Sequence, residues 1–175
     1  MQTFLPYPSF TQSAQALDYK RLGKQRVEAM QIIKAITGEK TLKGKSYKGW
    51  VKHPCSVMWK NYVPALKRYH NVMIDEWVYR GYENSMQKYP DNEVSDLVVD
   101  LPYWFGDKDF HKSHKANLLR KNYDFYLKPS WFFVSPKLPY VWFDEKQQKY
   151  HIDENYIRIY EGDDNFAYKK PTFKF

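Results

Sequence analysis

The stretch from Ser9 to Thr37 contains no proline, is rich in residues that favour helix and ends at Gly38. With about 100° of rotation per residue, its apolar side chains gather on one face and its polar side chains on the other. The apolar face consists of Leu22, Ala29, Met30, Ile33 and Ile36, and the polar face of Lys20, Lys24, Gln31 and Lys34. We therefore expect one long amphipathic helix, whose apolar face other elements must cover.

Two later segments also have apolar residues at helical spacing. One opens at Pro54 and continues to Arg80, and Pro64 within it predicts either a kink or two helices that meet there. The other begins near Asp107 and ends around Asn122, with leucines facing inward and many cations facing outward. The sequence thus predicts three long helices.

Aromatic residues must form much of the core, because the 175 residues include 16 Tyr, 11 Phe and 6 Trp. After residue 126, prolines separate clusters of these rings, which indicates loops packed on the helices. The segment from Tyr140 to Ile152 has apolar ends and a polar centre, a pattern that predicts a β-hairpin. We expect a mainly α fold: a compact bundle of three long helices with aromatic-rich loops and a small C-terminal β-hairpin. Residues 1–175 are expected to form a single domain, with residues 136–175 as an extra C-terminal segment.

A formal net charge of +8 points to a polyanionic partner such as nucleic acid. Cys55 is the single cysteine, so a disulfide framework is excluded and a reducing compartment is expected. No segment approaches about 18 uncharged apolar residues, and the first ten residues lack the pattern of a secretion signal. We expect a cytoplasmic protein that does not span a membrane and, at this size, a monomer.

Four polar residues form a row along the first predicted helix, at spacings of three, four and three. They are Asp18, Arg21, Gln25 and Glu28. One interpretation is a solvated helix face on which the arginine neutralises the acids. The other is a partly buried site in which a carboxylate is tuned for catalysis.

Four motifs, in this order along the chain, resemble the phage-type pyrimidine-dimer DNA glycosylases, also called endonuclease V enzymes. Leu17 to Glu28, with Gly38, is similar to the first long helix of that family, and His53-Pro54 through Arg80-Gly81-Tyr82 to its central helix. Phe110 to Lys115 falls where the family has its third helix, and Pro129-Ser130-Trp131 resembles a Pro-x-Trp motif. The resemblance covers about residues 1–135 and implies a DNA glycosylase-like domain.

The resemblance implies an enzyme that cleaves the N-glycosidic bond of an abnormal pyrimidine in duplex DNA and then nicks the abasic strand. In that family the N-terminal α-amine attacks the sugar C1′ and forms a Schiff base, helped by a glutamate of the first helix and by arginines. An ungapped match puts Gly23 where this glutamate belongs. We therefore assign its role to Glu28, with Asp18 as second choice, and the amine to Met1. Arg21 and Gln25 complete the predicted catalytic set.

Several alternatives remain open from the sequence. Water activated by Glu28 would release the base without strand cleavage, and the target is either a photodimer or a bulky modified pyrimidine. Other hypotheses are a catalytically inactive DNA-binding protein of the same fold and a metal-dependent nuclease. The acids available to such a nuclease include Asp96, Asp100 and Asp163. We expect no cofactor and no metal, because His111 and His114 have no third ligand at a recognisable spacing.

Double-stranded DNA is the expected partner. A basic surface that replaces counterions along the DNA backbone is expected on the third predicted helix, and Trp131 is the candidate for stacking on or wedging beside a base. The predicted DNA contacts are Lys24, Arg26, His53, His111, Lys112, His114, Lys115, Arg120 and Trp131.

Overall fold

The computed structural model describes residues 2–40, 44, 47–152 and 157–162. The contacts divide the chain after Asp107 into two compact units, which we call unit 1 and unit 2 and describe separately. Within the described residues there are eight α-helices, of which four have seven residues or more, and one small antiparallel sheet. The mainly α prediction is confirmed, whereas the predicted set of three long helices is not.

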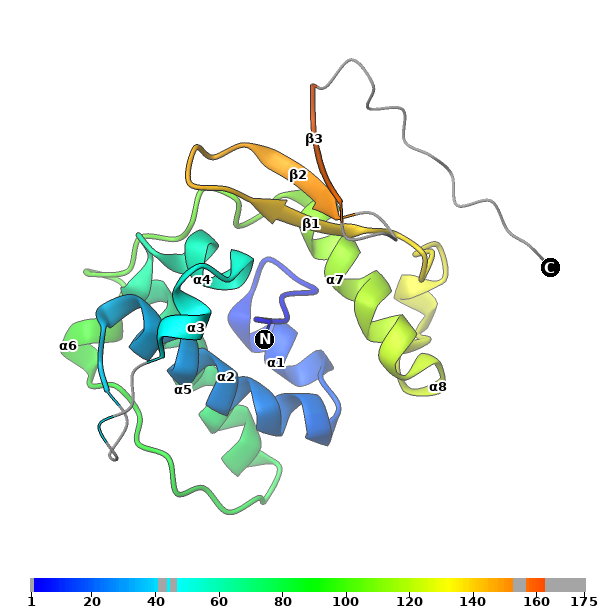
Figure 1. Cartoon of the computed structure of the whole chain (residues 1–175). Helices are drawn as coiled ribbons and strands as arrows, with labels where there is room; N and C mark the ends of the chain where they lie inside the picture. The colour runs from blue at the N-terminus through cyan, green and yellow to red at the C-terminus, as the bar shows by residue number, and fades with distance from the viewer. Residues whose placement is uncertain (1, 41–43, 45–46, 153–156, 163–175) are drawn as a thin grey trace. The chain divides into compact units, whose positions relative to one another are not determined.

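The regular elements in the described part of unit 1 are all α-helices. Its helices are α1 (Phe10–Ala16), α2 (Tyr19–Thr37), α3 (Lys48–Val51), α4 (Pro54–Trp59), α5 (Val63–Tyr79) and α6 (Asp91–Val94). The long helices α2 and α5 pack against each other, and α1 also packs on α5 (Figure 1). Their apolar faces meet around fully buried side chains such as Leu22, Ile33, Leu66 and Tyr69.

The first predicted helix is divided into α1 and α2 at Leu17-Asp18. Leu17 ends α1 in an extended conformation, and Asp18 begins α2 as its N-cap, where Oδ1 accepts a hydrogen bond from Arg21 N at 3.0 Å. Aspartate stabilises a helix start by satisfying a free backbone N–H, so the chain bends where the apolar spacing alone predicts continuation. The other predicted boundaries agree: Gly38 ends α2 with a φ of 78°, and Pro64 lies in the first turn of α5, separate from α4.

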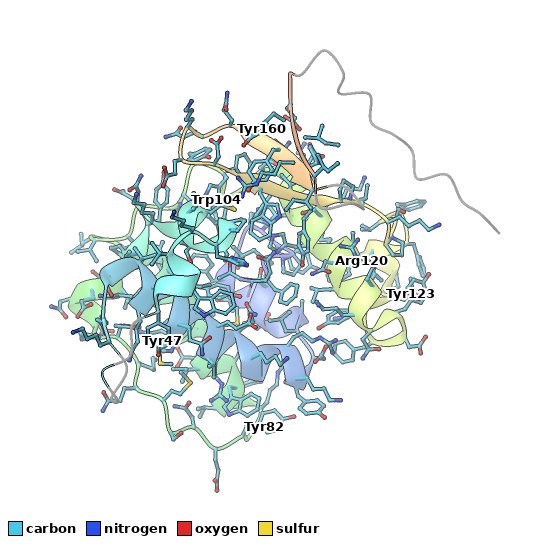
Figure 2. All side chains as sticks on the ribbon, viewed as in Figure 1. Tyr47, Tyr82, Trp104, Arg120, Tyr123 and Tyr160 are labelled. Carbon is cyan, nitrogen blue, oxygen red and sulfur yellow. The ribbon has the colours of Figure 1, made fainter. Side chains whose placement is uncertain are left out.

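Aromatic rings fill the remaining core of unit 1, as their number predicts (Figure 2). Trp59 and Trp104 meet edge to face at 5.0 Å, and Phe10 meets Tyr69 at 5.6 Å and Phe105 at 5.1 Å. Edge-to-face contacts of this kind stabilise beyond the area that the rings bury.

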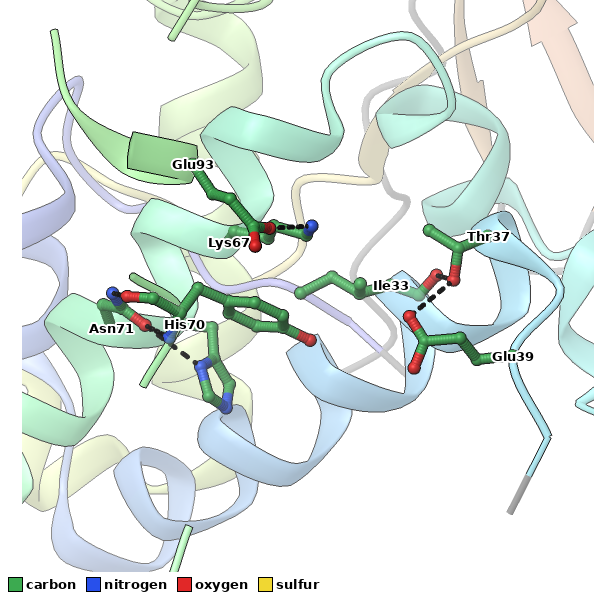
Figure 3. Close-up of polar contacts among 8 residues, drawn as sticks. Ile33, Thr37, Glu39, Lys67, His70, Asn71 and Glu93 are labelled. Carbon is green, nitrogen blue, oxygen red and sulfur yellow. Dashed lines mark hydrogen bonds and ion pairs between the residues drawn. The ribbon is translucent and has the colours of Figure 1, made fainter. Parts of the chain in front are cut away.

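Hydrogen bonds and ion pairs also fix the ends of these helices (Figure 3). Thr37 Oγ1 donates to Ile33 O at 3.0 Å in the last turn of α2, and Lys67 of α5 pairs with Glu93 of α6. Asn71 of α5 holds the loop at Tyr89 through two hydrogen bonds, of 2.8 and 2.9 Å. The loop between α5 and α6 is therefore held against α5.

Unit 2 combines two helices with the sheet. It contains α7 (Lys108–Lys121), α8 (Tyr123–Tyr126), the 3-10 helix η1 (Pro129–Trp131), and strands β1 (Tyr140–Phe143), β2 (Lys149–Ile152) and β3 (Arg158–Tyr160). The strands are antiparallel in the order β1-β2-β3, so the predicted hairpin is present and a third strand extends it. Ser113 Oγ accepts from Val141 N at 3.2 Å and donates to Phe110 O at 2.8 Å, which ties β1 to α7. Among the described helices, none has both the length and the apolar character needed to cross a membrane.

Candidate active site

Gln25 of α2 is buried and holds the amino-terminal segment against the helix. Its Oε1 accepts hydrogen bonds from Phe4 N at 2.8 Å and from Tyr69 Oη at 2.5 Å. Its Nε2 donates to Gln2 O at 2.8 Å. The side chain thus joins three parts of unit 1: the segment before α1, the helix α2 and the helix α5.

Glu28 lies one turn further along α2 and contacts the same segment. Its Oε2 accepts hydrogen bonds from Gln2 N at 3.2 Å and from Gln25 Nε2 at 3.1 Å. N–H donors directed at a carboxylate stabilise its negative charge and fix its position. We call Gln2, Gln25 and Glu28 the amide–carboxylate site. The predicted polar row is correct in placing Gln25 beside Glu28.

Asp18 and Arg21 pair with each other at the other end of the row. Asp18 is buried at the start of α2, and its Oδ2 pairs with Arg21 Nη1 at 3.1 Å. Ten residues of α-helix separate Asp18 from Glu28, a rise of about 15 Å. The row therefore divides into a capping pair at one end and the amide–carboxylate site at the other.

The start of α4 meets the amino-terminal segment at Thr3. Thr3 Oγ1 accepts from Trp59 Nε1 at 2.9 Å and lies 3.5 Å from Cys55 Sγ. Burial raises the pKa of the Cys55 thiol to about 11, so the sulfur stays protonated at neutral pH and is a poor nucleophile. Thr3, Tyr69 and Trp59 were not predicted from sequence, because their partners lie 44 to 65 positions away.

His53 caps α4 and is half-buried. Its Nδ1 accepts a hydrogen bond from Cys55 N at 3.2 Å, and its ring packs edge to face on Trp50 at 5.5 Å. Burial lowers the pKa of His53 below its usual value, so the ring is neutral at neutral pH. With Nδ1 as an acceptor, a neutral ring carries its proton on Nε2.

Arg26 and Lys24 differ in their surroundings. The Arg26 guanidinium lies 4.0 Å from the ring centre of Trp77, and Nη1 donates to Asn84 Oδ1 at 2.8 Å. Arg26 therefore links α2 to α5 and to the loop that follows α5. Lys24 is exposed on the same helix.

Three of the predicted DNA contacts in unit 2 are buried: His111, His114 and Trp131. The His114 ring packs on Phe110 at 4.3 Å, and Trp131 stacks on Tyr126 at 5.9 Å. Burial lowers the pKa of His114 well below its usual value, so it carries no charge at neutral pH. The expectation that His111 and His114 belong to an exposed basic surface is wrong, because this side of α7 faces the aromatic core of unit 2. Trp131, predicted to stack on a base, is fully buried within unit 2.

The cations of unit 2 have mixed surroundings. Lys112 is exposed, and Lys115 lies 5.8 Å from the ring centre of Trp131. Arg120 donates to the carbonyl groups of Pro136 and Leu138, so its charge also holds the loop before β1 (Figure 2). Contact of these cations with DNA stays a prediction.

Some predicted residues lie outside the described part, namely Met1 and Asp163. Asp96 pairs with Arg68, and Asp100 is exposed. Across the described ranges, no group of three His, Cys, Asp or Glu side chains is arranged to hold a metal ion. The nuclease hypothesis therefore gains no support from the described residues.

A family model described as pyrimidine dimer DNA glycosylase matches residues 1–90. The match covers more than half of the chain and includes α1, α2, α4, α5 and the whole amide–carboxylate site. The chain belongs to the pyrimidine dimer DNA glycosylase family. Membership implies DNA glycosylase activity in general and DNA as the substrate. No curated protein and no solved structure matches the chain.

Proposed function

We propose that this protein excises a damaged or modified pyrimidine from duplex DNA and that Glu28 is its catalytic carboxylate. Breaking the N-glycosidic bond develops positive charge on the deoxyribose, and a fixed carboxylate beside C1′ stabilises that charge. The observation that carries the proposal is the pair of N–H donors, from Gln2 and Gln25, that hold Glu28 Oε2 beside the amino-terminal segment.

The Met1 α-amine is the proposed nucleophile. Its lone pair forms a bond to C1′ while the N-glycosidic electrons leave with the base, and the amine proton passes to Glu28 or to water. Opening of the sugar ring then gives a Schiff base, from which the abasic strand is cleaved. Chain connection supports this role, because Met1 is bonded to the Gln2 nitrogen, which lies 3.2 Å from Glu28 Oε2.

Two further residues have positioning roles in this proposal. Gln25 holds both Glu28 and the backbone of Gln2, so it fixes the distance between the carboxylate and the segment that bears the amine. His53, neutral and carrying its proton on Nε2, is a hydrogen-bond donor for a phosphate or a base. Lys24 and the exposed cations Lys112 and Arg120 are the proposed contacts with the DNA backbone.

Base release from defined duplexes tests the role of Glu28. Duplexes that carry a thymine dimer or a modified pyrimidine are incubated with the protein, with and without alkali, and the strands are separated by size. We expect Glu28→Gln, which keeps a hydrogen-bond acceptor but removes the charge, to slow base release about 100-fold or more. Glu83→Gln, at an exposed position, is the control and retains the rate. Unimpaired release by Glu28→Gln contradicts the role, and no release by the unaltered protein favours the inactive DNA-binding protein.

Borohydride trapping separates the two nucleophiles. Reduction of a Schiff base leaves a covalent adduct between protein and DNA, and mass spectrometry of its peptides locates the attachment. Attachment at the Met1 amine is the expected result. Base release without any adduct would instead assign the attack to a water molecule activated by Glu28.

A further inference from the structure

A groove of about 450 Å³ follows the exposed side of α2 and reaches Glu28. Two rows of α2 residues line the groove, and within each row successive residues lie one helical turn apart. Tyr19 and Gly23 belong to one row, and Lys20, Lys24 and Glu28 belong to the other. Nine residues of helix, a rise of about 13 Å, separate the tyrosine from the glutamate.

Gly23 makes a notch in this groove, and Trp77 of α5 forms the wall of the notch. A Cβ atom at position 23 would lie 3.0 Å from Trp77 Cζ3 and 3.2 Å from Cη2, so tight a contact that the indole would have to move by a few tenths of an ångström. The indole is held in place, because the Arg26 guanidinium lies over it, the Tyr82 ring packs at 4.3 Å and Nε1 donates to Glu83 O at 2.8 Å. The indole therefore packs closely against the backbone at Gly23, and a side chain at this position would take up space in the groove and press on the indole.

The chemistry of the groove changes from one end to the other. Lys20 and Lys24 are exposed, and their Cβ atoms lie one turn apart, about 5–6 Å. Next to them is the Tyr19 ring, which is 54% exposed. At the other end, Glu28 repels phosphate groups and is the carboxylate of the amide–carboxylate site. Cations for the phosphates, an aromatic surface for the base and a carboxylate for the sugar are the groups that bind one nucleotide of a DNA strand.

We propose that the notch beside Gly23 and Trp77 receives the base of the target nucleotide, while Lys20 and Lys24 bind the adjoining phosphates. This arrangement directs the deoxyribose toward Glu28, and it rests on the proposed function. Gly23 and Trp77 then determine specificity, because they set the width of the space available to the base.

Binding to two duplexes tests the notch. Both duplexes have the same sequence; one carries a thymine dimer, and the other carries tetrahydrofuran, an abasic analogue that has no base. Affinities are measured by fluorescence anisotropy in the Glu28→Gln background, which prevents turnover. We expect Trp77→Ala to weaken binding of the dimer duplex about tenfold and to leave the abasic duplex within about twofold. Gly23→Ala, a smaller change, acts in the same direction.

Matched controls come from the same unit. Tyr79→Ala removes an 86% exposed ring from α5, and Gly49→Ala adds a methyl group where no atom lies within 4 Å. Both should leave the two affinities unchanged. Lys20→Ala and Lys24→Ala should weaken both duplexes equally and reduce the slope of log K against log salt by about one each. Circular dichroism checks that each variant is folded. If Trp77→Ala does not fold, Trp77→Phe, which keeps a ring, replaces it in the test.

Three results overturn the notch. The first is an equal loss of affinity for both duplexes, and the second is no loss for the dimer duplex from either Gly23→Ala or the Trp77 variant. The third is a preference of less than about twofold for the dimer duplex over the abasic duplex in the Glu28→Gln protein without further substitution. Failure of the proposed function is distinct, because it is an absence of base release by the protein that retains Glu28.

Discussion

At the scale of single residues, Gln25 is the side chain on which the candidate site depends most. A carboxamide has two N–H donors and two acceptor lone pairs, and the four bonds of Gln25 use all of them. A buried amide that is fully paired costs little to bury, whereas removing it leaves several buried groups unpaired. An amide satisfies Phe4 N, Gln2 O and Glu28 together because it both donates and accepts hydrogen bonds.

We therefore predict that Gln25→Ala lowers the free energy of unfolding by about 3 kcal/mol, since Phe4 N, Gln2 O and Tyr69 Oη lose a buried partner. It also slows base release, because Glu28 loses one of its two donors. Urea unfolding and the duplex assay measure the two effects. Gln15→Ala, at an exposed position, is the control. A loss below about 0.5 kcal/mol would show that the hydrogen bonds of Gln25 contribute little.

The residues of the site were only partly predictable from sequence. Spacing on a helix places Gln25 and Glu28 on one face, and this much is correct. The same spacing includes Asp18 and Arg21, because periodicity does not reveal that an aspartate will cap the helix instead of continuing its row. The roles of Gln2 and Tyr69 depend on contacts across 23 and 44 positions, which no local pattern contains.

At the scale of elements, Arg80 at the end of α5 fixes the bend between α1 and α2. Its Nη1 donates to Leu17 O at 2.7 Å, and its Nη2 donates to Ala14 O at 3.2 Å. Glu76 holds the same guanidinium through Nε at 2.7 Å. Carbonyl groups at the C-terminal end of a helix lack partners within the helix. A cation placed there bonds to them and interacts favourably with the negative end of the helix dipole.

Arg80→Ala should accordingly lower the free energy of unfolding by about 2 kcal/mol, because Leu17 O loses the guanidinium that it bonds and Ala14 O keeps only its bond from Leu17 N. Arg68→Ala removes an exposed ion pair with Asp96 and should cost about 0.5 kcal/mol or less. Denaturant unfolding of both variants gives the comparison. Equal effects would contradict a special role for Arg80 at the bend.

Elements marked by proline or glycine were predictable, and so was the hairpin of β1 and β2, whereas the third strand of the sheet was not. Gly38 and Pro64 set boundaries that the structure reproduces, because their backbone preferences act locally. Strand β3 exists only through its pairing with β2. On α7, the four-residue spacing of Phe110, His114 and Leu118 does indicate a common buried face, and it is the signal that could have identified His114 as buried.

At the scale of the whole molecule, buried histidines connect stability to pH in both units. His70 of α5 is 1% exposed, and burial lowers its pKa, as it does for His114 of α7 (Figure 3). In the unfolded chain both rings have ordinary pKa values near 6.5. As the pH falls below that value, the unfolded chain binds protons before the folded protein does, so the folded state loses stability.

We predict that the free energy of unfolding is highest above about pH 7 and falls between pH 6.5 and 5, by up to about 1.4 kcal/mol per pH unit for each histidine. Urea unfolding at a series of pH values measures the slope. His70→Gln in unit 1 and His114→Gln in unit 2 should each reduce the slope of the free energy of unfolding against pH. A slope unchanged by both substitutions would assign the acid sensitivity to other groups.

The close approach of Gly23 to Trp77 links the two positions in evolution. A side chain at position 23 presses on the indole unless position 77 also becomes smaller, and a smaller residue at position 77 alone leaves a gap between α2 and α5. Aligned relatives should therefore show the two positions changing together. Glycine at position 23 should occur with tryptophan at position 77, and a larger residue at position 23 with a smaller one at position 77. Lineages that exchanged both would have reshaped the groove without opening a gap between the two helices.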